Sequence, residues 1–409
     1  MLKMPTALLV ILCILAIAGG AQGTERIQRV ETGLPIMEIG EQGPVQTENL
    51  ATIEDRLVYY KVPGVSIAII DNYQIAWSKS YGMLNNNGKT PATTSSVYQA
   101  GSVSKMITAA IVLHYVDEGV LALDRDVNEY MKSWQIPASE FTRGKPVTLR
   151  NILSHRSGLP STNFSYDAEI GLPSIVQILR GEIPALNEPA VVGFVPESKY
   201  QYSNIGYVVV QQILEEVVGK PLAQIAQEVI CEPLGMTRTT FNHPLPVEWQ
   251  ADEALPHSNE GKTLVPAQKS LARAQGGLMA SAEDLAKFAV EIMKTTSGKS
   301  NLIFGQDMAR QQLNGLAQVG PRDFGGIPFR VGLGSYVLDE HQDLSFMHLG
   351  VSYPGSEAVV VGFPSRGQGA VIMVNADNNT LLMLEILASL VNEYGWPSGD
   401  YCNPAKHGN

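Results

Sequence analysis

The chain has 409 residues, an apolar content of 44% and 17% charged residues. This composition is typical of a globular protein and excludes a largely disordered chain. The formal net charge is −11 and no cluster of lysine or arginine occurs. These features argue against a nucleic-acid partner, because phosphate backbones bind to basic surfaces.

The N-terminus has the pattern of an export signal. Lys3 precedes an apolar run over residues 7–18, which is too short to span a bilayer, and Ala21-Gln22-Gly23 offers small residues for cleavage. The sequence therefore predicts a signal peptide over 1–23 and a periplasmic or secreted protein with no transmembrane anchor after cleavage. Cys231 and Cys402 would remain, and their pairing is left open, as is the oligomeric state.

The first part of the mature chain predicts a linker, a helix, a hairpin and a second helix. Glycines and prolines without periodicity predict the linker over 24–45, and apolar spacing predicts a helix over 47–61 with Thr47 as a possible cap. Apolar runs at 65–70 and 74–81 around a polar turn predict a β-hairpin. A buried helix follows Ser102 and ends at Gly119.

Helical patterns dominate from about 125 to 270, including a clear helix over 204–218, and a capped helix follows over 282–294. Extended runs then return at 331–338, 345–349, 357–363 and 369–375, before a last helix over 381–394. This order predicts an α+β fold, in which an antiparallel sheet has N- and C-terminal helices and an inserted all-helical lobe. The expected domain covers 46–409, with an α/β lobe (46–125 and 271–400) and a helical lobe (126–270).

Ser102 and Lys105 form the first candidate catalytic pair. Ser102 lies at or near the start of the predicted helix, where free N–H groups favour negative charge. Lys105 is three residues on, so its amine rises on the same face. A hydroxyl beside an amine can act as an activated nucleophile, although an N-cap serine followed by a lysine would look the same.

Tyr202-Ser203-Asn204 lies in a polar turn just before the helix over 204–218. A phenol near a cationic lysine has its ionised form favoured, so Tyr202 could act as a base below its usual pKa of about 10. Asn204 supplies an amide that can donate and accept. An ordinary turn with a half-buried tyrosine is the alternative.

His348-Leu349-Gly350 ends a predicted strand, and Val351 follows it. A glycine there allows a substrate to approach the backbone closely. The N–H of Val351 could then serve as an oxyanion donor beside that of Ser102. A strand-end glycine with a surface histidine is the alternative. The seven histidines show no metal-binding spacing, so neither a metal nor a cofactor is expected.

The three motifs occur together with several characteristic flanking segments. These are VPGVS at 62–66, YQAGS at 98–102, LSHRSGL at 153–159, PLGM at 233–236 and GGLM at 276–279. In this order the chain resembles the serine β-lactamase and penicillin-binding-protein superfamily, especially its class C β-lactamase and family VIII esterase branch. The resemblance covers about residues 47 to 395.

The resemblance implies a nucleophilic Ser102 that forms an acyl-enzyme, with Lys105 and Tyr202 sharing proton transfer. Asn204 would hold the substrate amide or carbonyl, and His348, Gly350 and Val351 would line the binding site. His348 departs from the lysine that classical β-lactamases carry in this motif, and histidine is mostly neutral at pH 7.

We therefore expect an exported serine hydrolase acting on a small ester, amide, peptide or β-lactam substrate, as an esterase or peptidase or with β-lactamase-like activity. The alternatives are a true class C β-lactamase or D-alanyl-D-alanine carboxypeptidase, and a catalytically silent penicillin- or peptide-binding module.

Overall fold

The computed structural model describes residues 23–40, 43–85, 88–162, 165–167, 169–264, 270–319, 328–340, 343–352, 355–377 and 380–397. Residues 1–22 of the predicted signal peptide and Cys402 lie outside this part. The described residues up to Tyr60 and from Thr380 onward form one compact unit, here called the terminal unit. The described residues between them form the central unit.

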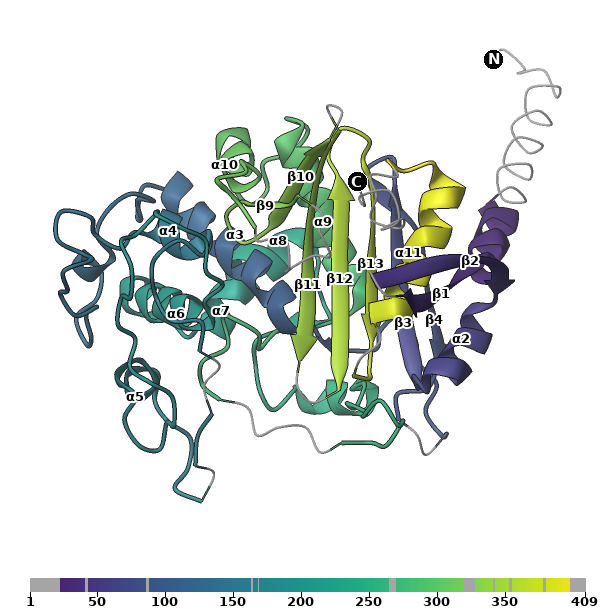
Figure 1. Cartoon of the computed structure of the whole chain (residues 1–409), viewed down its shortest axis with the longest axis horizontal. Coiled ribbons are helices and arrows are strands. Elements are labelled where there is room, and N and C mark those ends of the chain that lie inside the picture. Colours follow the sequence, from purple (N-terminus) through teal and green to yellow (C-terminus); the bar gives the residue numbers. More distant parts are fainter. Residues whose placement is uncertain are drawn as a thin grey trace, which may run out of the picture. The chain divides into compact units, whose positions relative to one another are not determined.

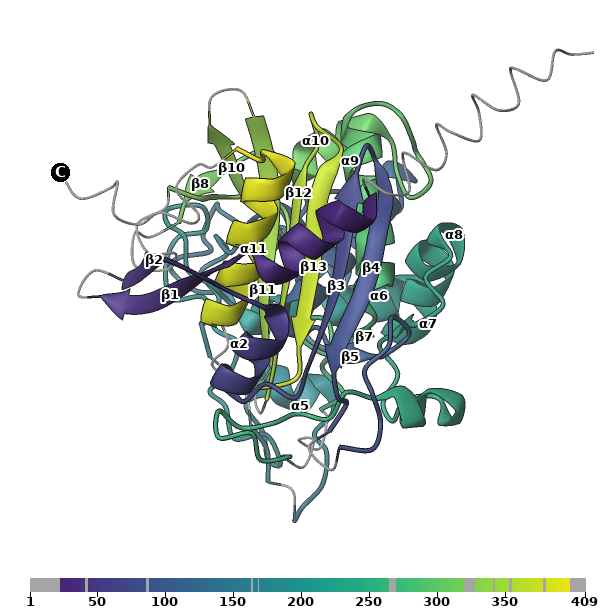
Figure 2. The same ribbon diagram turned by 90° about the vertical axis from the view of Figure 1, so that its right-hand side faces the viewer.

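An antiparallel sheet of eight strands organises the central unit. Its spatial order is β4-β3-β13-β12-β11-β10-β9-β8, and each neighbouring pair is antiparallel. In Figure 1 the long strands β11, β12, β13, β3 and β4 run side by side, and Figure 2 shows β4 outermost. The strands are β3 (Gly64–Asp71), β4 (Gln74–Gly82), β8 (Ala317–Gln318), β9 (Arg330–Val331), β10 (Tyr336–Glu340), β11 (Asp343–Ser352), β12 (Ser356–Phe363) and β13 (Gln368–Val374).

The predicted hairpin and the return of late strands to the first sheet are both confirmed. β3 and β4 pair around a turn at Asn72 and Tyr73, which both have positive φ. β13 pairs with β3, with Ile372 opposite Ile67, so segments about 300 residues apart share one buried layer. Strands buried along their length read as apolar runs, which explains why the sequence located them.

Helices of the central unit pack against this sheet and build much of the region from 126 to 270. α9 packs against β3, β4, β12 and β13, while α6 is buried among α3, α4, α5 and α7. The helical segments are η1 (Gly101–Val103), α3 (Ser104–Asp117), η2 (Val127–Glu129), α4 (Leu149–Leu153), α5 (Ile175–Arg180), α6 (Asn204–Val218), α7 (Leu222–Ala226), η3 (Gln227–Cys231), α8 (Glu232–Leu234), η4 (Val247–Asp252), α9 (Ala282–Thr296) and α10 (Gln306–Gln312).

The insertion expected to be helical throughout also contributes a strand. β6 (Thr239–Thr240) pairs with β7 (Met279–Ala280), which in turn pairs with β5 (Tyr98–Gln99). A two-residue strand has too few positions for period-two patterning, so the sequence did not reveal it. The proposed division into lobes remains a prediction.

Cys231 lies in the same insertion and is a free, buried thiol whose Sγ lies 3.7 Å from the carbonyl oxygen of Thr239. Burial raises the pKa of this thiol to about 12.

The terminal unit differs from its predicted secondary structure. Residues 23–32 are helical, and β1 (Leu34–Gly40) pairs with β2 (Gly43–Ala51) where a linker was expected over 24–45. Gly33 follows the helix directly, and Gly40 and Gly43 are paired at the ends of the two strands. The glycines therefore lie at the ends of regular elements instead of marking an unstructured segment.

The helix predicted over 47–61 is shorter than expected. α2 (Ile53–Tyr60) begins after Thr52, whose hydroxyl accepts from the Asp55 N–H, while the Asp55 carboxylate accepts from the Thr52 N–H. This reciprocal cap fixes the start, so Thr47 lies in β2 instead of capping the helix. The predicted final helix is confirmed as α11 (Thr380–Tyr394). Within the described segments, no helix combines the length and apolar character needed to cross a membrane.

Candidate active site

Ser102 lies at the start of the helical run that the sequence predicted. It sits in the 3₁₀ turn η1, directly before α3. The Ser104 hydroxyl donates to the Gly101 carbonyl at 2.6 Å and accepts from the Leu278 N–H at 3.0 Å. The turn that carries Ser102 is therefore tied to the segment that precedes β7.

Lys105 reaches Ser102 from the first turn of α3. Its Nζ lies 3.1 Å from Ser102 Oγ, 2.9 Å from Asn204 Oδ1 and 2.6 Å from the carbonyl oxygen of Gln275. The side chain is fully buried, and none of these partners carries a charge. Burial lowers the pKa of Lys105 well below the ordinary lysine value.

Tyr202 also contacts the Ser102 hydroxyl. Its OH lies 2.8 Å from Ser102 Oγ, and Lys105 Nζ is 4.8 Å from the centre of its ring. Burial raises the pKa of Tyr202. The sequence-based expectation that a cationic lysine would favour the ionised phenol is therefore wrong, because desolvation is the largest influence on this pKa.

Asn204 begins α6, one residue after the N-cap. Ser203 Oγ accepts from the Gly206 N–H and closes the cap, which leaves the Asn204 side chain directed at Lys105. The structure therefore brings together the four polar residues predicted from the first two motifs. Asn204 contacts the amine, and its expected contact with substrate remains a prediction.

Gly350 and Gly101 let two backbone segments touch beside Ser102. A Cβ on Gly350 would lie 2.0 Å from the Ala100 carbonyl oxygen and 3.3 Å from Ser102 N, and one on Gly101 would lie 2.8 Å from Val351 N. Only glycine fits at either position, and Gly101 also has a φ of +50°. The backbone N atoms of Ser102 and Val351, predicted as oxyanion donors, thus belong to two segments in direct contact.

His348 is buried, in contrast to the surface position considered in the sequence analysis. Its Nδ1 lies 2.7 Å from the carbonyl oxygen of Leu349, which can only accept, so Nδ1 carries the proton. The ring packs 5.2 Å from that of Tyr336. Burial lowers the pKa of His348 to about 3, so the imidazole is neutral at pH 7.

Several neighbours of the site were not identified from the sequence. They are His155, Tyr207 and Tyr336, together with the Gln275 carbonyl. The segment LSHRSGL drew attention to the first, but its role depends on tertiary contacts. A backbone carbonyl has no sequence signature, and only the following Gly276-Gly277 marked its location. Burial raises the pKa of both tyrosines and lowers that of His155, so these side chains are uncharged at pH 7.

Among the residues that the structure describes, no group of three or more His, Cys, Asp or Glu side chains is arranged to hold a metal ion.

Several known proteins are similar to part of this chain. An unguisins hydrolase of Aspergillus campestris is 28% identical over 203 residues, which are 48% of this chain and 36% of that protein. Penicillin-binding protein 4 of Amycolatopsis lactamdurans is 29% identical over 182 residues, 43% of this chain and 44% of that protein. The chain thus spans less than half the length of these curated relatives.

The octameric penicillin-binding protein homologue from Pyrococcus abyssi has a similar structure, with a TM-score of 0.69 and 26% identity. The match covers 84% of this chain and 76% of that one. A profile of the beta-lactamase family matches residues 50–387, which include all seven predicted site residues. The chain therefore belongs to the beta-lactamase family.

Proposed function

We propose that this protein is a serine hydrolase that cleaves ester or amide bonds through an acyl-enzyme on Ser102. The observation that carries the proposal is the contact of Ser102 Oγ with a buried amine and a half-buried phenol, at 3.1 and 2.8 Å. Membership of the beta-lactamase family and the hydrolase among the relatives support the same reaction class.

Lys105 is neutral in the resting enzyme. Leaving a charged ammonium buried without a carboxylate costs several kcal/mol. The ring centres of Tyr202 and Tyr207 lie 4.8 and 5.5 Å from Nζ. Cation–π attraction to these rings would stabilise the ammonium by only about 1–2 kcal/mol. The three oxygen partners of Nζ are uncharged, so burial favours the neutral amine.

The neutral amine sets the direction of the hydrogen bonds. It has two N–H groups, and both have acceptors, Asn204 Oδ1 and the Gln275 carbonyl oxygen. The Nζ lone pair is left for the third contact, so Ser102 donates its proton to Lys105. Tyr202, with a raised pKa, donates to Ser102 Oγ. The chain runs from phenol to hydroxyl to amine.

This direction assigns the proton transfers. Ser102 Oγ attacks the substrate carbonyl while its proton moves to Lys105 Nζ, and the N–H groups of Ser102 and Val351 stabilise the oxyanion. As the bond to the leaving group breaks, Tyr202 protonates the leaving group and regains a proton from the Lys105 ammonium. Water then hydrolyses the acyl-enzyme by the reverse transfers.

The buried, neutral His348 points to the substrate class. A lysine at this motif would offer a fixed cation to a substrate carboxylate, and a neutral imidazole does not. We therefore favour substrates without a carboxylate at that end. A β-lactamase or D-alanyl-D-alanine carboxypeptidase activity would need a cation from elsewhere.

Active-site labelling tests the proposal. A fluorophosphonate should add one adduct to Ser102, seen by peptide mass spectrometry. Ser102→Ala should show no adduct and an unchanged melting temperature, and Ser198→Ala, at an exposed serine, should label like the wild type. No adduct in folded wild-type protein would favour the silent binding module.

A turnover comparison separates the substrate classes. We expect p-nitrophenyl butyrate to be hydrolysed faster than the β-lactam nitrocefin. The reverse order would favour the β-lactamase.

Export is proposed from the signal peptide predicted over 1–23. Expression of the full chain in a bacterial host should yield a periplasmic or secreted protein that begins after Gly23. An unprocessed N-terminus would contradict this.

A further inference from the structure

We propose that His155 is a positioning residue for Tyr202, and that it acts as a neutral hydrogen-bond acceptor. This inference rests on the proposed function, since it concerns the phenol that donates to Ser102.

The main chain places His155 beside Tyr202. His155 follows α4 and has a φ of +55°, in the left-handed region that non-glycine residues rarely adopt. This turn directs its carbonyl oxygen toward the segment before α6, where it accepts from the Gln201 N–H at 2.8 Å.

The imidazole of His155 binds the main chain on the other side of Tyr202. Its Nδ1 accepts from the Ser203 N–H at 3.1 Å. One residue therefore binds the backbone N–H groups immediately before and after Tyr202, which fixes the stretch of chain that carries the phenol.

The ring of His155 also packs along that of Tyr202. The two ring centres are 4.3 Å apart and the planes are tilted by 35°. Tyr207 lies on another side of the imidazole, at 5.5 Å. The packing restricts rotation of the phenol, and a well-placed OH is required for the 2.8 Å contact with Ser102.

The acceptor role requires the neutral imidazole. Because Nδ1 accepts from Ser203, it carries no proton, and an imidazolium would present a second donor to that N–H. Burial of the side chain also disfavours a charge there. His155 therefore orients Tyr202 and does not take part in proton transfer itself.

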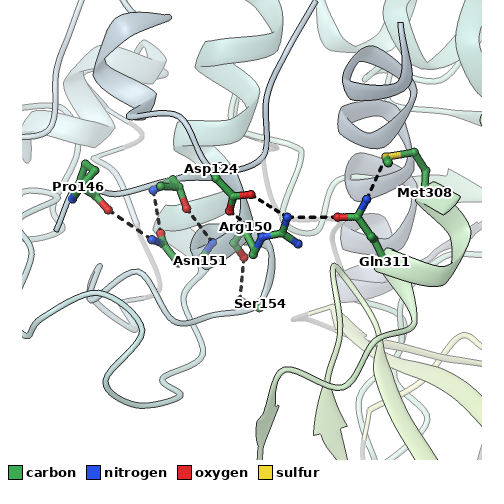
Figure 3. A network of polar contacts seen from close by, with 8 residues as sticks. Asp124, Pro146, Arg150, Asn151, Ser154, Met308 and Gln311 are labelled. Carbon is green, nitrogen blue, oxygen red and sulfur yellow. Dashed lines mark hydrogen bonds and ion pairs between the residues drawn. The ribbon is translucent and has the colours of Figure 1, made fainter. Parts of the chain in front are cut away.

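Several side-chain contacts hold α4, the helix that precedes His155. Arg150 binds both carboxylate oxygens of Asp124, at 2.7 and 2.8 Å, and the side-chain oxygen of Gln311 at 3.1 Å. Asn151 closes a capping box at the start of the helix, and Ser154 Oγ donates to the Arg150 carbonyl oxygen. Figure 3 shows these contacts on both sides of the helix.

Two single variants separate the acceptor from the ring. His155→Phe keeps a ring and removes the acceptor, and we expect its fluorophosphonate acylation rate to fall about 30-fold or more. His155→Asn restores an acceptor in a residue that tolerates positive φ, and we expect it to recover part of the loss. His114→Phe removes an imidazole contact elsewhere, with the Ile303 carbonyl near the end of α3, and should acylate at the wild-type rate.

A double-mutant cycle with Tyr202→Phe supplies the decisive readout. Loss of a general acid or base typically lowers a rate by about 10²- to 10⁴-fold, so we expect Tyr202→Phe to acylate about 10³-fold more slowly. Because His155 acts through Tyr202, adding His155→Phe to Tyr202→Phe should reduce the rate less than threefold further. Rates are normalised to the folded fraction measured by circular dichroism.

Multiplicative losses in the cycle, or an unchanged rate in His155→Phe, would overturn the positioning role. Absence of an adduct in the wild type would instead overturn the proposed function, so the two failures are distinguishable.

Discussion

Each of the two units buries a basic side chain, Arg56 in the terminal unit and Lys105 in the central unit. The two side chains have different kinds of partner. In the terminal unit, Arg56 Nε and Nη2 donate to the two carboxylate oxygens of Glu385, both at 2.8 Å, and Tyr60 OH also lies 3.0 Å from this carboxylate. In the central unit, Lys105 is equally buried, but its partners are a hydroxyl, an amide oxygen and a carbonyl oxygen.

The difference lies in what each environment does to the proton. The pKa of Arg56 is raised by Glu385, although its burial acts in the other direction, so the guanidinium stays charged. The pKa of Lys105 is lowered by burial, with no carboxylate to oppose it. A paired buried cation is a structural element, whereas an unpaired buried amine becomes a base.

The largest effect should come from removing the amine. Lys105→Met should slow acylation of Ser102 about 10³-fold, because general base catalysis is lost. The free energy of unfolding should stay constant or rise, because an apolar side chain replaces a poorly solvated polar one. Stopped-flow acylation and urea unfolding measure the two quantities. A rate loss below tenfold would show that Lys105 is not the base.

Removing the paired cation should produce the opposite pattern. Arg56→Met leaves the Glu385 carboxylate buried and unpaired, which should lower the free energy of unfolding by about 3–5 kcal/mol. Acylation per folded molecule should not change. Adding Glu385→Gln keeps an acceptor for the Met37 N–H and removes the charge, so the double variant should recover part of the loss.

The lowered pKa of Lys105 also predicts how acylation and stability depend on pH. The active form of Lys105 is deprotonated, so acylation should rise with pH through an inflection below the ordinary value of 10.5. In the window between the folded pKa and this value, the unfolded chain binds the proton and the folded chain does not. The free energy of unfolding should therefore rise with pH there. Neither trend from this group should appear in Lys105→Met.

The smallest effect concerns specificity at the third motif. His348→Lys should raise the rate for a carboxylate-bearing ester relative to a neutral ester, by about tenfold if a charge-assisted contact forms. His348→Gln is the neutral control and should leave the ratio unchanged. An unaltered ratio in both variants would show that this position does not face the substrate.

Much of the fold and of the candidate site could be predicted from the sequence, because the elements that carry Ser102 and Asn204 have strong local signals. α3 and α6 are apolar runs closed by glycine, and the hairpin β3–β4 is a pair of runs around a turn. The order of the motifs then predicted a common site for Ser102, Lys105 and Tyr202, whose side chains are in contact in the structure.

The remaining features depend on tertiary burial and on backbone atoms. The sequence cannot show that Tyr202 is desolvated, so the direction of its pKa shift was predicted wrongly. Every residue has a backbone carbonyl, so the sequence does not single out that of Gln275. The left-handed backbone conformation of His155 also has no local sequence signal. Glycines at 33, 40 and 43 were assigned to a linker because turn residues look alike in both settings.

The most direct test of the account is the pKa of Lys105 itself. Protein labelled with ¹³C at lysine Cε can be titrated by NMR, with the Lys105 signal assigned by its absence from Lys105→Met. We predict that this amine titrates well below the other lysines and is neutral at pH 7. A pKa at or above the ordinary lysine value would leave Lys105 charged at rest and would contradict its role as the base that activates Ser102.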